Sequence, residues 1–190
     1  MSGASKGAVV IGASAGALEA LSIILPSLKA DFPWPIFVIV HLPPDKRSVL
    51  AQIFDAKCAL TAIEAEDKEP VRAGTIYFSP PDYHMLIEDR ETIALSNEDE
   101  VLFSRPSIDV SFESAADVWG ETLVGVVLTG ANQDGAKGLR AIVRAGGTAL
   151  VQDPKGAYAS AMPEAALAAC PQAQVLSLSQ IASHLSGLAS

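Results

Sequence analysis

Short runs of apolar, β-branched residues, each ended by glycine, proline or a polar residue, set the framework of this chain. They cover residues 8–12, 36–40, 123–128 and 148–151, and we expect a last strand at 174–177. Runs this short, with no polar alternation, are typical of strands buried on both faces, as in a parallel sheet. The pattern therefore predicts an α/β fold: a single doubly wound, mostly parallel sheet with helices on both faces.

The segments between the runs carry apolar residues at helical spacing. We expect helices over residues 17–30, 46–55, 108–119, 135–145, 163–169 and 179–188. The buried face of the first helix is predicted to consist of Leu18, Leu21, Ile24, Leu25 and Leu28. Gly146 and Gly147 are suited to end the fourth helix. Pro163 fits the first turn of the fifth, where a missing N–H costs nothing.

Residues 60–97 contain shorter segments than the rest of the chain. Short strands are expected at 60–63, 75–78, 84–88 and 92–95. The break at residues 89–91 between the last two predicts a hairpin. We therefore expect a small antiparallel hairpin beside the parallel sheet.

Length and composition restrict the classes of protein. With 190 residues and 49% hydrophobic content, we expect residues 1–190 to form a single domain with a continuous core. The apolar runs fall far short of the roughly 20 residues that a membrane span needs. Residues 1–7 carry one lysine and lead straight into a strand, so we expect no signal peptide and a cytoplasmic protein.

Charge and cysteine content narrow the partners further. A net charge of −9 argues against a nucleic-acid partner, which usually requires a basic face. Cys58 and Cys170 are too few and too far apart for a metal cluster or a disulfide framework. We expect both to be reduced structural thiols.

Three polar residues stand just after apolar runs: Ser14, His41 and Asp134. The carboxyl ends of parallel strands share one edge of the sheet, where ligands collect. The strands before Ser14 and His41 are expected to be neighbours, about 4.8 Å apart, so that these side chains can meet. Serine, histidine and aspartate are the parts of a nucleophilic triad. Spacing alone leaves Asp153 open as an alternative acid, and we interpret His184 as a solvated surface residue.

The loop at residues 12–16 has three interpretations. It is a nucleophile turn that exposes Ser14, a phosphate-binding loop at a helix start, or a helix N-cap formed by Ser14. A dinucleotide loop is disfavoured, because Ser14 and Ala17 occupy two of its glycine positions and the next strand ends in His41. The order serine, histidine, aspartate also differs from that of an α/β-hydrolase. For Asp134 the alternative role is an N-cap carboxylate.

As a set, the residues resemble the catalytic domain of the chemotaxis receptor methylesterases (protein-glutamate methylesterases of the CheB type), over about residues 7–187. The similarity lies in residues 10–16, 40–44, 80–85, 105–110, 128–139, 152–153 and 162–163. It implies hydrolysis of glutamate methyl esters on the cytoplasmic helices of chemoreceptors, with release of methanol, and deamidation of receptor glutamines. It also implies that no metal or organic cofactor takes part.

The resemblance assigns roles to single residues. It implies a catalytic triad of Ser14, His41 and Asp134, and so selects Asp134 over Asp153. The backbone N–H groups of Ala15 and Ala131 become candidate oxyanion-hole donors.

The chain departs from the family pattern near these residues. Ala15 stands where the family has Ser or Thr, Ala17 where it has Gly, and Ala131-Asn132 where it has Met-Gly. Asn132 would be strained if its φ angle were positive, although asparagine tolerates that region best among non-glycine residues. We expect an active enzyme whose rate depends on these changes.

Other hypotheses about function and control stay open. The family's best-known members carry an N-terminal receiver domain, and the first strand here begins too early for one, so we expect a stand-alone domain controlled, if at all, by a separate regulator chain. The alternative functions are an esterase with another substrate, a catalytically weakened binding module of the same fold, and a phosphate- or nucleotide-binding module.

Overall fold

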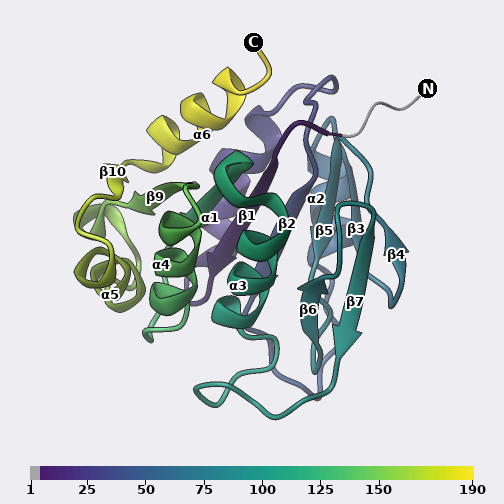
Figure 1. The fold of residues 1–190 in the computed structure, drawn as a ribbon, viewed down its shortest axis with the longest axis horizontal. Helices are drawn as coiled ribbons and strands as arrows, with labels where there is room; N and C mark the ends of the chain where they lie inside the picture. Colours follow the sequence, from purple (N-terminus) through teal and green to yellow (C-terminus); the bar gives the residue numbers. More distant parts are fainter. Residues whose placement is uncertain (1–4) are drawn as a thin grey trace.

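A seven-stranded parallel sheet forms the centre of the computed structural model, which describes residues 5–190 (Figure 1). The strand order is β10-β9-β8-β1-β2-β5-β3, and every neighbouring pair is parallel. The strands are β1 (Ala8–Ala13), β2 (Ile36–Val40), β3 (Thr61–Glu64), β5 (Thr75–Phe78), β8 (Leu123–Val127), β9 (Thr148–Gln152) and β10 (Gln174–Leu176). The predicted fold class is confirmed.

Helices cover both faces of the sheet. They are α1 (Ala17–Ile24), α2 (Leu50–Lys57), α3 (Ile108–Trp119), α4 (Ala136–Arg144), α5 (Ala161–Ala169) and α6 (Leu178–Gly187). Side chains of α3, α4 and α5 share one buried cluster, and those of α1, α2 and α6 share the other. Short 3-10 turns lie at Leu25–Ser27, Gly120–Thr122 and Pro154–Gly156.

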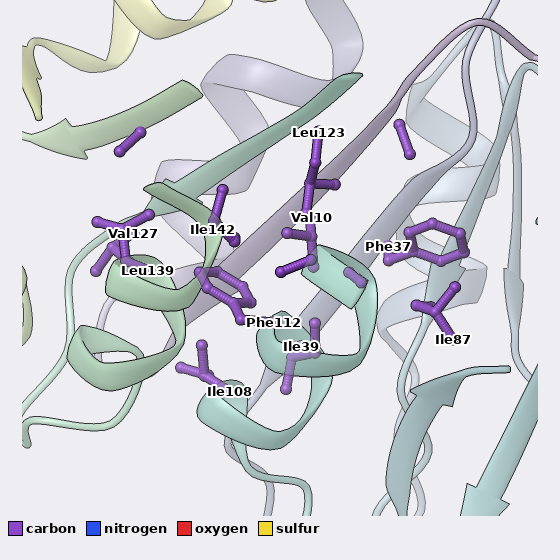
Figure 2. Close-up of a cluster of buried hydrophobic side chains, with 14 of the residues drawn as sticks. Val10, Phe37, Ile39, Ile87, Ile108, Phe112, Leu123, Val127, Leu139 and Ile142 are labelled. Atoms are coloured by element: carbon purple, nitrogen blue, oxygen red, sulfur yellow. The ribbon is translucent and has the colours of Figure 1, made fainter. Parts of the chain in front are cut away.

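The alternation of side chains along β1 separates the two cores. Val10 points to the α3–α4 face, into the buried cluster that also contains Phe112 and Leu139 (Figure 2). Val9 and Ile11 point to the opposite face, against α1 and α6. Because both faces are covered, all six residues of β1 are buried.

The middle of the chain forms a separate three-stranded antiparallel sheet, in the order β4-β7-β6. Its strands are β4 (Glu69–Pro70), β6 (His84–Ile87) and β7 (Thr92–Ser96). The β6–β7 hairpin confirms the prediction from residues 89–91. Strand β4 was not predicted, because two residues that end in proline carry no strand pattern.

Two helix predictions need correction. The first helix was expected to reach residue 30, but α1 ends at Ile24 and a 3-10 turn containing Pro26 follows, since proline cannot continue the backbone hydrogen bonds. Leu18 was assigned to its buried face and is 46% exposed. The second helix begins at Leu50 and not near residue 46, because residues 43–47 are exposed prolines and charged residues with no apolar face to pack.

The prediction that Gly146 and Gly147 end the fourth helix is confirmed. Gly146, at φ 88°, ends α4: its N–H donates to Val143 O and that of Gly147 to Ile142 O, which is the Schellman pattern. Both cysteines are free thiols. No helix in residues 5–190 is both long enough and apolar enough to cross a membrane.

Strand β1 marks the point where the chain direction across the sheet reverses. From β1 the chain runs through β2 towards β3, and later through β8 and β9 towards β10. In sheets of this kind a crevice opens at the carboxyl ends of the strands beside such a switch point. The carboxyl ends of β8, β1 and β2 are therefore the first place to look for a site.

Candidate active site

The three neighbouring strands β8, β1 and β2 each lead into one of the predicted site residues. Ser14 follows β1, and its N–H donates to Thr129 O of the β8 end at 2.9 Å. His41 follows β2, and its N–H donates to Ala13 O at 3.3 Å. Asp134 belongs to the loop between β8 and α4. The predicted pairing of the strands before Ser14 and His41 is confirmed.

Ser14 lies at the start of a tight turn. Its carbonyl accepts from Ala17 N at 2.9 Å, and Gly16 adopts φ 86° and ψ 8°, which is the third position of a type II turn. A Cβ at Gly16 would lie 2.7 Å from Tyr158 Cβ, so only glycine fits. Gly16 is the N-cap of α1 and no side chain caps it, so the interpretation of Ser14 as an N-cap is wrong. Ala17 starts the helix, which explains why alanine is tolerated there.

Thr129 fixes this turn from the end of β8. Its hydroxyl donates to Ala15 O at 2.8 Å and accepts from Ala159 N at 2.9 Å. Its own N–H donates to Oε1 of the buried Gln152 at 2.9 Å. Thr129 belongs to the motif at residues 128–139, but no role was predicted for it from the sequence. A threonine directly after a buried strand is the signal that could have suggested one.

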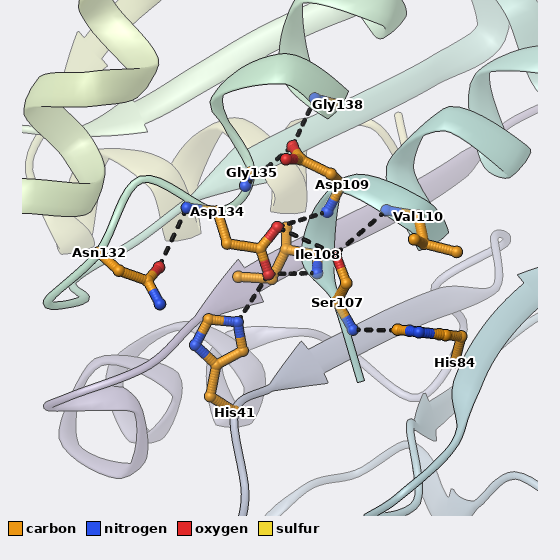
Figure 3. Close-up of polar contacts among 10 residues, drawn as sticks. All are labelled: His41, His84, Ser107, Ile108, Asp109, Val110, Asn132, Asp134, Gly135 and Gly138. Atoms are coloured by element: carbon orange, nitrogen blue, oxygen red, sulfur yellow. Dashed lines mark hydrogen bonds and ion pairs between the residues drawn. The ribbon is translucent and has the colours of Figure 1, made fainter. Parts of the chain in front are cut away.

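His41 and Asp134 form a direct pair. His41 Nε2 lies 2.7 Å from Asp134 Oδ2, and the Asp134 side chain is fully buried (Figure 3). Because a carboxylate only accepts, Nε2 carries the proton and Nδ1 keeps a free lone pair. Within residues 5–190 no hydrogen bond joins Ser14 Oγ to His41. The structure thus pairs two of the three predicted residues and places the third at the neighbouring strand end.

Asp134 also binds the start of α3. Its Oδ1 accepts from Asp109 N at 2.9 Å and from Ser107 Oγ at 3.1 Å, and its Oδ2 accepts from Ile108 N at 2.7 Å (Figure 3). Burial by itself would raise the pKa of Asp134, but the hydrogen bonds from His41, Asp109 and Ile108 outweigh it and lower that pKa. Asp134 therefore stays ionised, and it caps the start of α3. The N-cap alternative had assigned it to α4, the helix that follows it, but the N-cap residue of that helix is the glycine after Asp134.

Asp109 makes the reciprocal contact. Its Oδ1 accepts from Gly135 N at 3.0 Å and from Gly138 N at 2.7 Å, where α4 begins. Asp134 thus binds N–H groups at the start of α3, the helix that contains Asp109, and Asp109 binds those at the start of α4, the helix that follows Asp134. The pKa of Asp109 is raised to about 6, chiefly by burial; the negative charge of Asp134 also raises it, while the N–H groups of Gly138 and Gly135 lower it. Asp109 was not predicted from the sequence to be part of the site.

The raised pKa of Asp109 gives a prediction about stability. Because its folded-state pKa lies above the ordinary value, ionisation of Asp109 costs stability as pH rises through about 6. In Asp109→Asn the oxygen acceptor remains and this cost disappears. The difference in unfolding free energy, variant minus wild type, is expected to be about 1 kcal/mol more positive at pH 8 than at pH 5.

Urea unfolding at the two pH values measures this difference. Asp117→Asn is the matched control, since Asp117 is an exposed aspartate two turns further along α3. The charged groups facing Asp109 are Asp134, paired with His41, and Glu113 with its partner Lys137. A difference that is the same at both pH values would contradict the assignment.

The expected oxyanion donors are open. Within the described part of the chain, no acceptor is recorded for the N–H of Ala15 or of Ala131. Asn132 is absent from the residues with positive φ in that part, so the strain considered for it does not arise. Its Oδ1 instead accepts from Asp134 N at 3.0 Å, which braces the loop that carries the carboxylate.

The other aspartate and histidine residues considered for the site have different roles. Asp153 accepts from Lys155 N at 3.0 Å and caps a short 3-10 turn. His84 is buried, with Nε2 2.9 Å from Asp99 O and Nδ1 accepting from Ser107 N. His184 is half-buried in α6, and so less solvated than expected. Of these, only His84 reaches the residues around Asp134, and it does so through Ser107.

Comparison with known proteins gives consistent matches. The family model described as CheB methylesterase matches residues 9–185. A putative protein-glutamate methylesterase/protein-glutamine glutaminase of Leptospira interrogans is 45% identical over 175 residues, which cover 92% of this chain and 91% of that protein. A protein-glutamate methylesterase/protein-glutamine glutaminase of Symbiobacterium thermophilum is 40% identical over 92% of this chain but only 48% of its own length.

A solved structure also matches. The crystal structure of the Thermotoga maritima CheB methylesterase catalytic domain superposes with a TM-score of 0.91 at 32% identity, covering 96% of this chain and 98% of that one. This chain thus spans nearly the whole Leptospira protein and about half of the Symbiobacterium one.

Proposed function

Because the chain belongs to the CheB methylesterase family, we propose that it hydrolyses methyl esters of glutamate side chains in a chemoreceptor and releases methanol. Deamidation of receptor glutamines is the second reaction of this proposal, since the named relatives are also glutaminases. The proposal treats residues 1–190 as one catalytic domain that acts in the cytoplasm, with regulation by a separate chain.

The observation that carries the proposal is the buried Asp134 carboxylate bound to His41 at 2.7 Å, one strand away from Ser14, whose hydroxyl makes no hydrogen bond within residues 5–190. In the proposed reaction Ser14 Oγ attacks the ester carbonyl while His41 Nδ1 takes its proton. The protonated His41 then gives this proton to the departing methoxide, which leaves as methanol. Water, activated by the same nitrogen, hydrolyses the acyl-serine and regenerates the enzyme.

The two ring nitrogens of His41 have roles opposite to those of the catalytic histidine in a serine protease. There Nδ1 faces the aspartate and Nε2 the serine, whereas here Nε2 faces Asp134. The chemistry is the same, because each arrangement leaves one protonated nitrogen on the carboxylate and one basic nitrogen for the serine. The missing Ser14–His41 hydrogen bond agrees with a site that tightens when substrate binds.

The negative charge that develops on the ester oxygen needs donors. The open N–H groups of Ala15, which follows Ser14, and of Ala131, in the loop after β8, are proposed to bind this oxygen, each contributing on the order of 3 kcal/mol in sites of this kind. Side-chain changes at these positions leave the backbone donors in place. This supports activity despite the departures from the family pattern.

The thiols do not compete as nucleophiles. Burial is the main factor that raises the pKa of Cys58, and it also raises that of Cys170. A thiol is reactive as its thiolate, so both are poor nucleophiles at neutral pH.

Methanol release from membranes that hold a methylated chemoreceptor tests the proposal. We expect release by the wild type and none from the same membranes with unmethylated receptor. Hydrolysis of small esters without methanol release would favour an esterase with another substrate. A protein that neither releases methanol nor hydrolyses small esters would be a catalytically weakened binding module. Heat released on titration with nucleotides would favour a nucleotide-binding module.

A further inference from the structure

The loop between β7 and α3 ends in an unusual turn. Val101 and Ser104 exchange two backbone hydrogen bonds of 3.0 Å, and the two residues between them, Leu102 and Phe103, have φ angles of 51° and 63°. Positive φ at both central residues defines a type I′ turn, which strongly favours asparagine and glycine. Bulky side chains in this conformation cost stability.

Packing does not compensate for that cost. Phe103 is 96% exposed and Leu102 is 40% exposed. A large apolar side chain in a strained, fully solvated position stabilises the free protein neither by backbone preference nor by burial. Strain of this kind concentrates at functional positions.

The loop that carries the turn is held in place by two side chains, Arg105 and His84. The guanidinium of Arg105 donates to Asp82 Oδ1 through Nε at 3.1 Å and Nη2 at 2.6 Å, and through Nη1 to the carbonyls of Asn97 and Glu98. The buried His84 binds the carbonyl of Asp99 at 2.9 Å. The turn is therefore presented by a fixed support.

The segments on both sides of this braced loop reach the edge of the main sheet that carries the candidate active site. On one side, Ser107 follows the loop and donates to Asp134 at 3.1 Å. On the other, Asp82 lies after β5, the strand next to β2. Four residues from Phe103 to Ser107 span at most about 14 Å. Figure 1 shows this loop projecting from the end of the molecule where α3 begins.

The charges of the loop restrict what can bind there. Residues 98–100 are three consecutive exposed carboxylates, and the charge of Arg105 is already paired with Asp82. A glutamate methyl ester is neutral, whereas the product is an anion. The loop therefore suits a substrate surface whose carboxylates are esterified and disfavours the hydrolysed one.

We propose that Leu102 and Phe103 are an apolar docking point for the protein substrate, and that they contact an apolar residue on the receptor helix that carries the esterified glutamate. This inference rests on the proposed function. The occupant is a helix that carries an apolar side chain near a neutral ester and no carboxylate at the point of contact.

The double variant Leu102→Asn/Phe103→Gly tests the proposal, because it installs the residues that a type I′ turn prefers. We expect a melting temperature at least equal to that of the wild type and unchanged turnover of p-nitrophenyl acetate. With methylated receptor, kcat/KM should fall about tenfold through KM, since contact at the centre of an interface is lost. Phe103→Asn alone should give a smaller loss of the same kind.

Val175→Thr is the matched control, since Val175 is 48% exposed but lies on β10, at the far edge of the sheet. Unchanged receptor kinetics in the double variant would overturn the docking point. Equal losses with both substrates would also overturn it, because the turn would then act on the catalytic groups. A wild type that hydrolyses p-nitrophenyl acetate but releases no methanol from the receptor would refute the proposed function and, with it, the occupant assigned to the turn.

Discussion

Replacement of Ser14 by alanine is expected to lower methanol release from methylated receptor by at least about 10³-fold, because the attacking oxygen is lost. The fold should be unaffected. Ser14 holds the turn through its backbone N–H and C=O, and no hydrogen bond of its hydroxyl is recorded within residues 5–190. Initial rates at saturating receptor, with the melting temperature measured in parallel, separate a loss of chemistry from a loss of fold.

Ser22→Ala is the matched control. Ser22 is a half-buried serine in α1; its hydroxyl donates to Leu18 O in the preceding turn of the helix and accepts a 3.5 Å hydrogen bond from the side chain of Lys57. We expect it to retain the wild-type rate. A Ser14→Ala protein that releases methanol as fast as the Ser22→Ala protein would remove Ser14 as the nucleophile.

Asp134→Asn is expected to reduce activity by about 10³- to 10⁴-fold, the size of effect seen when a triad acid becomes an amide and the histidine loses its tautomer. It should also destabilise the protein by about 3 kcal/mol, because a buried carboxylate with several donors is replaced by a group that has a single acceptor oxygen. The donors are His41 Nε2, Ser107 Oγ, Ile108 N and Asp109 N. The amide would have to point its own NH₂ at one of them.

Kinetics and urea unfolding check the two effects separately. Asp153→Asn is the control, because that carboxylate caps a short turn and was the competing candidate for the triad acid. Full activity in Asp134→Asn, or a larger loss of activity in Asp153→Asn, would contradict the proposed assignment. Since the pKa of Asp134 is lowered from its ordinary value of 3.8, its stabilising contribution should be fully present above about pH 4 and be lost progressively as the pH falls towards the lowered pKa.

The features that could be predicted from the sequence are those that a local pattern of residues controls. Buried strands such as β2 and the helix α3 were placed with their observed bounds, because uniform apolar runs and apolar residues at helical spacing are local signals. The adjacency of β1 and β2 followed from the α/β pattern, and with it the meeting of two strand ends. Helix ends near Pro26 were less predictable, since apolar spacing continues past the point where proline stops the helix.

The support around the pair could not be predicted, because it depends on contacts between distant segments. Asp109 and Asp134 are 25 residues apart in the sequence, and each looks like an ordinary acid near a helix start. Their exchange of caps exists only because α3 and α4 begin side by side on the same face of the sheet. The same holds for Thr129, whose hydroxyl bonds Ala15 across 114 residues of sequence. The type I′ turn at Leu102 and Phe103 could not be predicted from residues 97–106, because leucine and phenylalanine are among the residues that this turn favours least.

Labelling with a fluorophosphonate ester probe, followed by peptide mass analysis, tests the central claim most directly. The probe reacts with a serine only where a base activates it and donors stabilise the oxyanion. We expect one adduct, on Ser14, with methanol release from methylated receptor lost in proportion to labelling, and no adduct in His41→Ala. An adduct on another serine, or undiminished methanol release by fully labelled protein, would contradict the account.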